Sequence, residues 1–363
     1  MINSSVKAGH VKIKVLVTDD SAFMRTAVRM MLKDDAGIDV IGEARDALTA
    51  IQMVETLNPD VITMDVDMPG MDGVMATQII MERFPRPIIM LSSLTDRGSE
   101  TTIQALAAGA VDFIPKKSSF VQLDIAQISS ELHKKIRFWG ERHLKAATGT
   151  GKTVPDRAVK GLRHFSNEFQ PELVVIGAST GGPAILSKLL SSMGRLTCPV
   201  VIAQHMPSTF TEGFARHLSM DTGLNVVHAS DGLELLPGVI AVCPGGVDTT
   251  VSESLPGRLH ICLTRNSAAL IHPSVNVLFA SAARLNRKTA AIILTGMGSD
   301  GTIGAQALVG NGCPVLVQEP GECTVDGMPS SAIEGGHVNE VLPVDGIGRQ
   351  LRKWAGVSEL QYN

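Results

Sequence analysis

The feature that most constrains the fold is an alternation of short apolar runs with longer segments of helical periodicity. In the first third of the chain the apolar runs cover residues 13–17, 38–41, 61–64, 88–91 and 111–114. Each run has the length of a β-strand, and the segments between them are long enough for helices. Strands that alternate with helices in this way form a parallel sheet with helices on both faces. The alternation therefore predicts a five-stranded, doubly wound α/β domain.

A second, larger block with the same alternation occupies about residues 172–356. Its apolar runs cover residues 173–176, 199–203, 226–229, 239–242, 259–263, 290–294 and 315–317. The chain has 363 residues, which is enough for two domains of ordinary size. We therefore expect two α/β domains. The first is a flavodoxin-like parallel sheet, and the second is a mostly parallel, Rossmann-like sheet with some antiparallel pairs.

Residues 136–171 differ from both blocks and are interpreted as an interdomain linker, partly helical at its start. The stretch is polar and contains GERHLKAATGTGKTVPDRAVKG, with no sustained apolar period. Its GTGKT is similar to part of a phosphate-binding P-loop, but that motif needs a glycine where Ala146 stands and a strand before it. A nucleotide site is therefore not expected. The expected parts are a first domain at 11–135, a linker at 136–171 and a second domain at 172–356.

Composition excludes several classes of protein. Apolar residues make up 44% of the chain and charged residues 19%, which indicates a globular rather than a disordered protein. The net charge is −4 and aromatic residues make up only 4%. Domains that bind nucleic acid are usually basic and often stack bases on aromatic rings, so nucleic acid is not expected as the main partner.

The cysteines and the lengths of the apolar stretches indicate in which part of the cell the protein is expected. The five cysteines are scattered, without the spacing of a zinc site or a disulfide framework, and this is typical of a reducing compartment. The first residues, MINSSVKAGHVKIK, lack the apolar region of a signal peptide. No stretch approaches the ~18 apolar residues of a membrane-spanning helix. We therefore expect a cytoplasmic protein.

Polar and charged side chains follow the apolar runs of the first block. Asp19 and Asp20 follow the first run, Asp65 the third, Ser92 the fourth and Lys116 the fifth. The carboxyl ends of parallel strands meet at one edge of a sheet, so these side chains should converge. Clustered carboxylates need a cation, and their oxygens are typical Mg²⁺ ligands. Asp65 is then a candidate nucleophile that forms an aspartyl phosphate, although any one of these residues alone is typical of an ordinary turn.

This pattern resembles the receiver domain of two-component response regulators. The resemblance covers about residues 11–135 and rests on VLVTDDSAFMR, VITMDVDMPGMDGV, PIIMLSS and AAGAVDFIPK. It implies that a histidine kinase phosphorylates Asp65 in the presence of Mg²⁺. The implied metal ligands are Asp19, Asp20, Asp65 and the backbone carbonyl of Asp67. The implied switch residues are the hydroxyl of Ser92, the ring of Phe113 and the ammonium of Lys116.

The chain departs from the receiver pattern at Lys117, where these domains usually have a proline, often after a cis bond. Without proline a cis bond costs ~3 kcal/mol, so we expect a trans peptide. We therefore do not expect this loop to have the usual receiver geometry, whereas the charge of Lys116 is unchanged.

The second block opens with a strand, a glycine-rich turn and a helix. The segment LVVIGASTGGPAILSKLL contains Gly177, Ser179 and Gly181 in the order G-x-S-x-G. In hydrolases this motif exposes a nucleophilic serine beside the backbone N–H groups of a helix start. An anion-binding or purely structural glycine turn is the alternative interpretation of the motif alone. GxGxxG is absent, so a dinucleotide site is less favoured.

A nucleophilic serine needs a base, and the base needs a group that orients it. His205 follows the run at 199–203, and Asp300 follows the run at 290–294, so both should lie near Ser179 if the strands are parallel. Several other residues compete weakly for these roles; they are His228, His260 and His272 for the base and Asp248 and Asp326 for the acid. The chain order Ser, His, Asp differs from that of the α/β-hydrolases, so that topology is not expected.

These motifs resemble the catalytic domain of the chemotaxis protein-glutamate methylesterases. The resemblance covers about residues 172–354 and includes RNSAALIHPSVNVLF and VDGMPSSAI. It implies that Ser179 is the nucleophile, His205 the base and Asp300 the orienting acid. It also implies that the loop at Met297 supplies a backbone N–H to the oxyanion and that Thr180 lines the pocket. The usual RPSVD-like stretch is HPSVN here, which bears on substrate contacts at His272 and Asn276.

Receiver, linker and methylesterase domain, in this order, are the whole layout of that family. The resemblance implies a hydrolase that demethylates γ-glutamyl methyl esters on chemoreceptors and deamidates some glutamines, with no cofactor for ester hydrolysis. It also implies that the unphosphorylated receiver covers the catalytic crevice and that a chemotaxis histidine kinase is the phosphodonor. The protein would then associate with the membrane only through receptors. Two alternatives stay open: a phosphorylation-switched binding protein with an inactive triad and, less favoured, a DNA-binding regulator.

Overall fold

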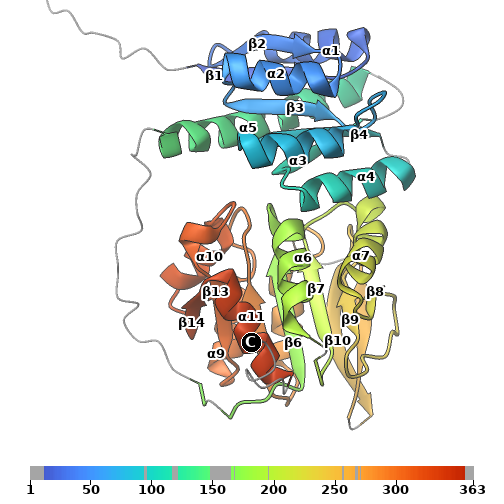
Figure 1. Ribbon diagram of the computed structural model, residues 1–363. Helices are drawn as coiled ribbons and strands as arrows, with labels where there is room; N and C mark the ends of the chain where they lie inside the picture. The colour runs from blue at the N-terminus through green and yellow to red at the C-terminus, as the bar shows by residue number, and fades with distance from the viewer. Residues whose placement is uncertain are drawn as a thin grey trace, which may run out of the picture. The chain divides into compact units, whose positions relative to one another are not determined.

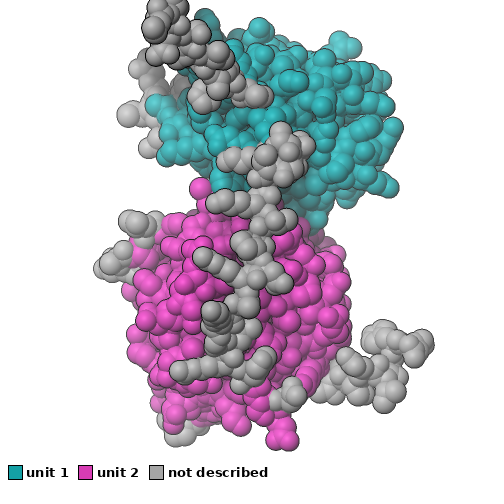
Figure 2. All heavy atoms as spheres, turned by 90° about the vertical axis from the view of Figure 1, so that its left-hand side faces the viewer, with its two compact units in different colours: residues 1–151 teal, residues 152–363 magenta. Residues whose placement is uncertain are grey.

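A computed structural model of the chain describes residues 12–93, 96–116, 122–147, 165–166, 168–194, 196–255, 257–265, 269 and 271–355. The chain divides into two compact units, residues 1–151 and residues 152–363 (Figure 2). The GTGKT stretch and Lys117, discussed above, lie outside the described residues. No helix in the described part of the chain is long and apolar enough to cross a membrane.

The first unit is built on a five-stranded parallel sheet in the order β2-β1-β3-β4-β5. Figure 1 shows β1, β2, β3 and β4 of this sheet. Its strands are β1 (Ile13–Thr18), β2 (Ile38–Ala44), β3 (Val61–Asp65), β4 (Ile88–Ser93) and β5 (Asp112–Lys116). Its helices are α1 (Ala22–Leu32), α2 (Ala47–Leu57), α3 (Gly73–Arg83), α4 (Asp96–Ala107) and α5 (Gln122–Ala147). Helices α1 and α5 pack together, while α2 packs on α3 and α3 on α4. The predicted doubly wound, flavodoxin-like fold is confirmed.

Local sequence accounts for where these elements begin. Three helices start at a side chain that accepts a backbone N–H of the first turn, and these caps are Ser21, Asp46 and Asp72. Every residue of the central strand β3 is buried, because helices cover both faces of the sheet. This burial explains why β3 appears in the sequence as a largely apolar run rather than as an alternating pattern.

Helix α5 continues into the segment that was expected to be a linker, partly helical at its start. The expected end of the first domain, residue 135, falls inside this helix, which continues to Ala147. Leu132, Ile136 and Trp139 are all buried, and they lie at the i, i+4 and i+7 positions of one helix face. The first part of the segment interpreted as a linker therefore belongs to the core of the first unit.

The second unit contains a seven-stranded sheet in the order β14-β13-β12-β6-β7-β9-β8, in which every neighbouring pair is parallel. Its strands are β6 (Leu173–Ala178), β7 (Val200–Gln204), β8 (Val226–His228), β9 (Ile240–Val242), β12 (Thr289–Ile293), β13 (Val315–Gln318) and β14 (Glu340–Leu342). A separate antiparallel pair consists of β10 (Asp248–Leu255) and β11 (Arg258–Thr264). The expectation of a larger, mostly parallel α/β domain is confirmed.

The helices of the second unit form two groups. Helix α6 (Gly182–Met193) packs against α7 (Ser208–Thr222) and α11 (Val344–Trp354). The other group consists of α8 (Val275–Ala283), α9 (Thr302–Gly310) and α10 (Gly327–Glu334), with α9 in contact with both of the others. A short 3₁₀ helix, η1 (Pro320–Glu322), precedes α10. Near the start of the unit, the rings of Phe165 and Phe169 contact Trp354, which is buried at the end of α11.

The strand order places one edge of the sheet at a topological switch point. From β6 the chain passes through α6 to β7 on one side, whereas β12 pairs with β6 on the other side. In open α/β sheets, ligands bind outside the carboxyl ends of strands at such a point. The carboxyl ends of β6, β7 and β12 are therefore where a functional site is expected, and they are the ends that precede Ser179, His205 and Asp300.

Candidate active site

Ser179 sits in a sharp turn between β6 and α6. Gly181, the residue that precedes α6, has φ +80°, a left-handed conformation that favours glycine. The turn is closed by the N–H of Gly182, which donates to the Ser179 carbonyl at 2.9 Å, and the N–H of Ser179 donates to the Thr295 carbonyl at 3.0 Å. The Ser179 side chain thus stands at the start of a helix, where backbone N–H groups lack intrahelical partners.

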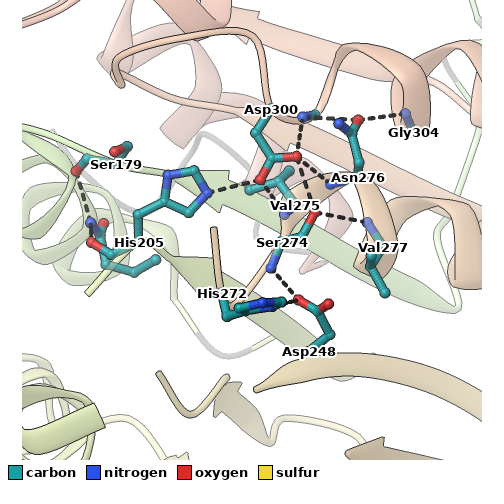
Figure 3. A network of polar contacts seen from close by, with 12 residues as sticks. Ser179, His205, Asp248, His272, Ser274, Val275, Asn276, Val277, Asp300 and Gly304 are labelled. Carbon is teal, nitrogen blue, oxygen red and sulfur yellow. Dashed lines mark hydrogen bonds and ion pairs between the residues drawn. The ribbon is translucent and has the colours of Figure 1, made fainter. Parts of the chain in front are cut away.

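His205 is the first residue after β7, and its imidazole lies between the other two candidate residues. Its N–H donates to the carbonyl of Ala178, the residue before Ser179, at 2.9 Å. Its Nε2 lies 2.9 Å from Oδ2 of Asp300. Figure 3 shows Ser179 and Asp300 on opposite sides of the imidazole. With Nε2 occupied by Asp300, Nδ1 is the ring nitrogen that can accept a proton.

Asp300 is held by the first turn of α8. Backbone N–H groups of Val275 and Asn276 donate to its carboxylate at 2.7 and 2.9 Å, and the Ser274 hydroxyl donates at 3.2 Å (Figure 3). Burial raises the pKa of Asp300, but the hydrogen bonds from His205 and from these two N–H groups outweigh it and leave the pKa below its usual value. The positive end of the α8 dipole acts in the same direction. The carboxylate is therefore ionised at neutral pH.

Gln204 contributes to the site and was not anticipated from the sequence. Its Nε2 donates to the carbonyl of Ser179 at 2.7 Å and to the carbonyl of His205 at 3.1 Å. The side chain is 2% exposed and lies at the last position of β7. One polar residue at the end of an apolar strand is the only sequence signal for this role. It ties the backbone of one candidate catalytic residue to that of the other.

The two residues expected to line the pocket lie in different surroundings. Thr180 follows Ser179 and is half-buried, and its carbonyl accepts the Thr295 hydroxyl at 2.9 Å. Met297 is exposed and follows Gly296. A Cβ atom on Gly296 would lie 2.7 Å from Cβ of Ser179, so the loop that carries Met297 passes directly beside the serine.

The competing residues have other partners. Nδ1 of His272 lies 3.1 Å from the buried carboxylate of Asp248, as a second imidazole–carboxylate pair below the first (Figure 3). His228 contacts the hydroxyl of Thr211, and His260 contacts that of Ser252. The remaining competitor, Asp326, precedes α10 and accepts a hydrogen bond from the Ser330 hydroxyl. Of the three candidate acids Asp248, Asp300 and Asp326, only Asp300 contacts the His205 side chain in the described part of the chain.

A second constellation lies at the carboxyl edge of the first sheet. Asp19, Asp20 and Asp65 each offer a carboxylate oxygen, and these oxygens all lie within 4.8 Å of one another. Nζ of Lys116 lies 2.7 Å from Asp65 and 2.8 Å from Asp19. Burial raises the pKa of Asp65 to about 6, although Lys116 opposes the shift. A cluster of three carboxylates with one ammonium has the donor set that Mg²⁺ prefers.

The other expected residues of this unit are Asp67, Ser92 and Phe113. The backbone N–H of Asp67 hydrogen-bonds Asp65 and lowers its pKa, while the Asp67 side chain is exposed. Ser92 is fully buried near the end of β4, and Phe113 is half-buried in β5. The ammonium of Lys135 lies 5.4 Å above the Phe113 ring.

Each of the two units matches a known protein family. The family model described as CheB methylesterase matches residues 174–351, and that described as response regulator receiver domain matches residues 15–126. A protein-glutamate methylesterase/protein-glutamine glutaminase of Lawsonia intracellularis is 36% identical over 360 residues, covering 93% of this chain and 98% of the relative. One of Halalkalibacterium halodurans is 39% identical, covering 94% and 99%.

The chain belongs to the CheB methylesterase family. Among solved structures it is similar to the Thermotoga maritima CheB methylesterase catalytic domain, with 35% identity and a TM-score of 0.49 over 51% of this chain and 98% of that one. The response regulator domain of Thermotoga maritima CheB is 44% identical, with a TM-score of 0.33 over 36% of this chain and 97% of that one.

Family membership confirms the resemblance inferred from the motifs in both halves of the chain. As a CheB methylesterase with a receiver domain, the protein is a hydrolase of a two-component signalling system. The two sites described above fall inside the two matched regions, the carboxylate cluster within 15–126 and Ser179, His205 and Asp300 within 174–351.

Proposed function

We propose that this protein hydrolyses γ-glutamyl methyl esters on chemoreceptors, deamidates receptor glutamines by the same chemistry, and is activated by phosphorylation of Asp65. The observation that supports the proposal is that Ser179, His205 and Asp300 follow three neighbouring strands at their carboxyl ends, with Asp300 in contact with the His205 imidazole. The names of the relatives, methylesterase and glutaminase, support the two reactions. We also propose a cytoplasmic location, because the receptor segments that such an enzyme modifies lie inside the cell.

The reaction begins at Ser179. Its Oγ attacks the ester carbonyl while His205 takes the hydroxyl proton at Nδ1, the nitrogen that does not face Asp300. The tetrahedral intermediate collapses as the imidazolium returns the proton to the departing methoxide, which leaves as methanol. Water then attacks the acyl-enzyme with His205 again as the base. The products are a receptor glutamate and free Ser179.

Asp300 orients the imidazole and stabilises its protonated form. An ionised carboxylate at Nε2 keeps the neutral ring in the tautomer with the proton on Nε2, so that the lone pair is on Nδ1. The N–H groups of α8 that hold Asp300 also keep it from taking the proton itself, because they favour its charged form.

The negative charge that develops on the carbonyl oxygen needs donors near Ser179. The loop of Gly296 and Met297 passes beside the serine, which supports a role for the Met297 backbone N–H as one donor. A donor of this kind typically contributes about 2.7–4 kcal/mol to the transition state. Thr180, next to the nucleophile, lines the pocket in this proposal.

The receiver supplies the regulation in this proposal. Asp65 takes a phosphoryl group from a chemotaxis histidine kinase, and Lys116 and Ser92 hold its oxygens. Asp19, Asp20, Asp65 and the Asp67 carbonyl are the groups that would hold Mg²⁺, which would supply positive charge to balance the carboxylates and the phosphoryl group. The rearranged Ser92, with Phe113, then relays the change and favours an open catalytic site.

The test is methanol release from methyl-esterified chemoreceptor, in Mg²⁺, with and without a small-molecule phosphodonor. We expect release by the wild type, stimulation by the phosphodonor, no release by Ser179→Ala, and no stimulation of Asp65→Asn. Release that survives in Ser179→Ala would contradict the proposed nucleophile. Absence of release from the phosphorylated wild type would favour a binding role with an inactive triad.

A further inference from the structure

Asn276 joins the two segments that hold the Asp300 carboxylate. It is the second residue of α8, and its backbone N–H donates to Asp300 at 2.9 Å. Its side-chain Oδ1 accepts the N–H of Gly301 at 3.0 Å and the N–H of Gly304 at 2.9 Å (Figure 3). One residue thus contacts Asp300 directly and also fixes the chain that follows it.

Helix α9 has no side chain of its own to cap its first turn. The residue before it, Gly301, has φ +99° and makes no side-chain cap hydrogen bond. The N–H groups at a helix start need acceptors, and the Asn276 amide supplies one from the neighbouring helix. The two helices pack so closely that a Cβ atom on Gly304 would overlap Cβ of Phe279. Asn276 therefore sets how the Asp300 loop lies against α8.

The charge of the Asn276 side chain matters as much as its shape. The Gly301 N–H lies 3.0 Å from Oδ1 of Asn276 and 3.0 Å from Oδ1 of Asp300, so the two oxygens share one donor. A carboxylate at position 276 could accept the same hydrogen bonds but would place a second negative charge beside Asp300. The amide keeps the number of charges in this network at one.

No other titratable side chain of the two helices faces this network. The segments VNVLFASAA of α8 and TIGAQALVG of α9 carry none. The charged or titratable neighbours are His205, which contacts Asp300, and the Asp248–His272 pair, which reaches Asp300 through Ser274. A charge added at position 276 therefore acts mainly on the Asp300–His205 pair.

We propose that Asn276 is a positioning residue for the Asp300–His205 pair: its amide holds the loop that follows Asp300 and adds no second negative charge beside the pair. The inference rests on the proposed function of that pair. The family resemblance pointed to a substrate contact at position 276; in this scheme Asn276 acts instead through Asp300 and the loop that follows it. Shape and charge are separable, because Asp preserves the hydrogen-bond acceptors and Ala removes them.

Two variants separate the two roles. In Asn276→Asp the acid limb of the kcat/KM profile for methanol release should move to higher pH by about one unit, because the added charge favours the protonated imidazole. Its plateau at high pH should stay within about threefold of wild type. In Asn276→Ala, kcat should fall about tenfold at every pH with an unmoved limb, because the Asp300 loop loses its acceptor.

Asn339→Asp is the matched control. The Asn339 side-chain oxygen also accepts a backbone N–H, from Val315 at 2.8 Å, but it does so at the amino end of β13, the opposite edge of the sheet. We expect Asn339→Asp to leave the pH profile unchanged. The thermal midpoint of each variant shows that the catalytic unit is folded. The same receiver is present in every variant, so a difference between profiles belongs to the catalytic unit.

An NMR titration of the His205 imidazole in the full-length chain gives a readout that needs no activity. The titration curve should move to higher pH in Asn276→Asp and stay in place in Asn339→Asp. An unmoved curve and an unmoved limb in Asn276→Asp would overturn the inference, as would a loss of activity equal to that of Asn276→Ala at all pH. If the curve moves while the wild type releases no methanol, the proposed function fails and the electrostatic coupling stands.

Discussion

Ser179 carries an ordinary hydroxyl group, and its surroundings are what distinguish it from the other serines of the chain. The turn at Gly181 places it at a helix start, Gln204 ties its carbonyl to that of His205, and the imidazole lies between it and Asp300. The proposed activity of Ser179 depends on single contacts of about 3 Å. We therefore expect that a substitution that removes one of these contacts changes the activity.

Asp300→Asn should reduce kcat for methanol release by about 10³–10⁴ with little change in KM. An asparagine can turn its NH₂ toward Nε2 of His205 and so favour the tautomer with the proton on Nδ1, which cannot accept the Ser179 proton. Steady-state kinetics on methylated receptor measures the effect. A kcat within threefold of wild type would mean that Asp300 does not orient the base.

Mg²⁺ binding to the receiver should weaken as the pH falls through 6. Burial raises the pKa of Asp65 to about 6, so this carboxyl is mostly protonated below that pH and ionised above it. A proton then competes with the cation, and the affinity should fall by up to about tenfold per pH unit below pH 6. Calorimetric titrations at pH 5 and pH 7.5 measure it. Equal affinities at the two pH values would contradict the role of Asp65 as a ligand.

At the scale of elements, the loop after β12 contributes to the candidate site beside Ser179. Thr295 accepts the Ser179 N–H and its hydroxyl bonds the Thr180 carbonyl, while Gly296 leaves no room beside Ser179 for a side chain. The carboxyl ends of β6 and β12 are thereby locked together. One added methyl group in this loop should therefore displace Ser179.

Gly296→Ala should lower kcat at least tenfold and also lower the thermal midpoint. The new Cβ would lie 2.7 Å from Cβ of Ser179 and would overlap the sulfur of Met328, so the turn of Ser179 has to shift. Gly310→Ala, at the end of α9, is the control because its Cβ meets nothing within 4 Å. It should be neutral or slightly stabilising. Equal kcat values for both variants would show that the loop does not fix the serine.

The sequence predicted elements well where burial is complete. Strands β6, β7 and β12 are fully buried and largely apolar in sequence, and their carboxyl ends precede Ser179, His205 and Asp300. Strand β14 was missed because it is short and only half-buried. The boundary expected at residue 135 falls inside α5, because beyond it the polar residues of the helix outnumber the buried Ile136 and Trp139.

Residues that act through backbone groups could not be predicted from sequence. Gln204 and Asn276 bond carbonyl and N–H groups of distant segments, and those partners are defined only by the tertiary fold. Nor does the sequence tell that Nε2, rather than Nδ1, of His205 meets Asp300. That detail depends on the direction from which β7 and the Asp300 loop approach one another.

At the scale of the whole molecule, the chain consists of two units with separate cores and separate constellations. Residues 148–164, between α5 and Phe165, connect them. The second unit begins in contact with its own last helix, since Phe165 and Phe169 lie 6.2 and 6.3 Å from the ring of Trp354. The start of an independent catalytic fragment is therefore defined by these rings.

A fragment of residues 165–363 should fold and release methanol faster than the unphosphorylated whole chain, because in the proposed regulation the unphosphorylated receiver is inhibitory and the fragment lacks it. A fragment that starts at residue 173 loses both phenylalanine rings and uncovers Trp354, which is 1% exposed in the intact unit. It should therefore have a lower thermal midpoint than the longer fragment. If the 165–363 fragment is folded but no faster than the unphosphorylated chain, inhibition by the receiver is wrong.

The most direct test of an activated serine is covalent labelling of the full-length chain by a serine-reactive fluorophosphonate, followed by peptide mapping. We predict one label on Ser179, which forms at least about a hundredfold more slowly in His205→Ala and is absent in Ser179→Ala. Ser187, also buried, is an internal comparison within α6. Absence of label on Ser179 of the phosphorylated wild type, or equal labelling of Ser179 with and without His205, would contradict the assignment of Ser179 as a nucleophile activated by His205.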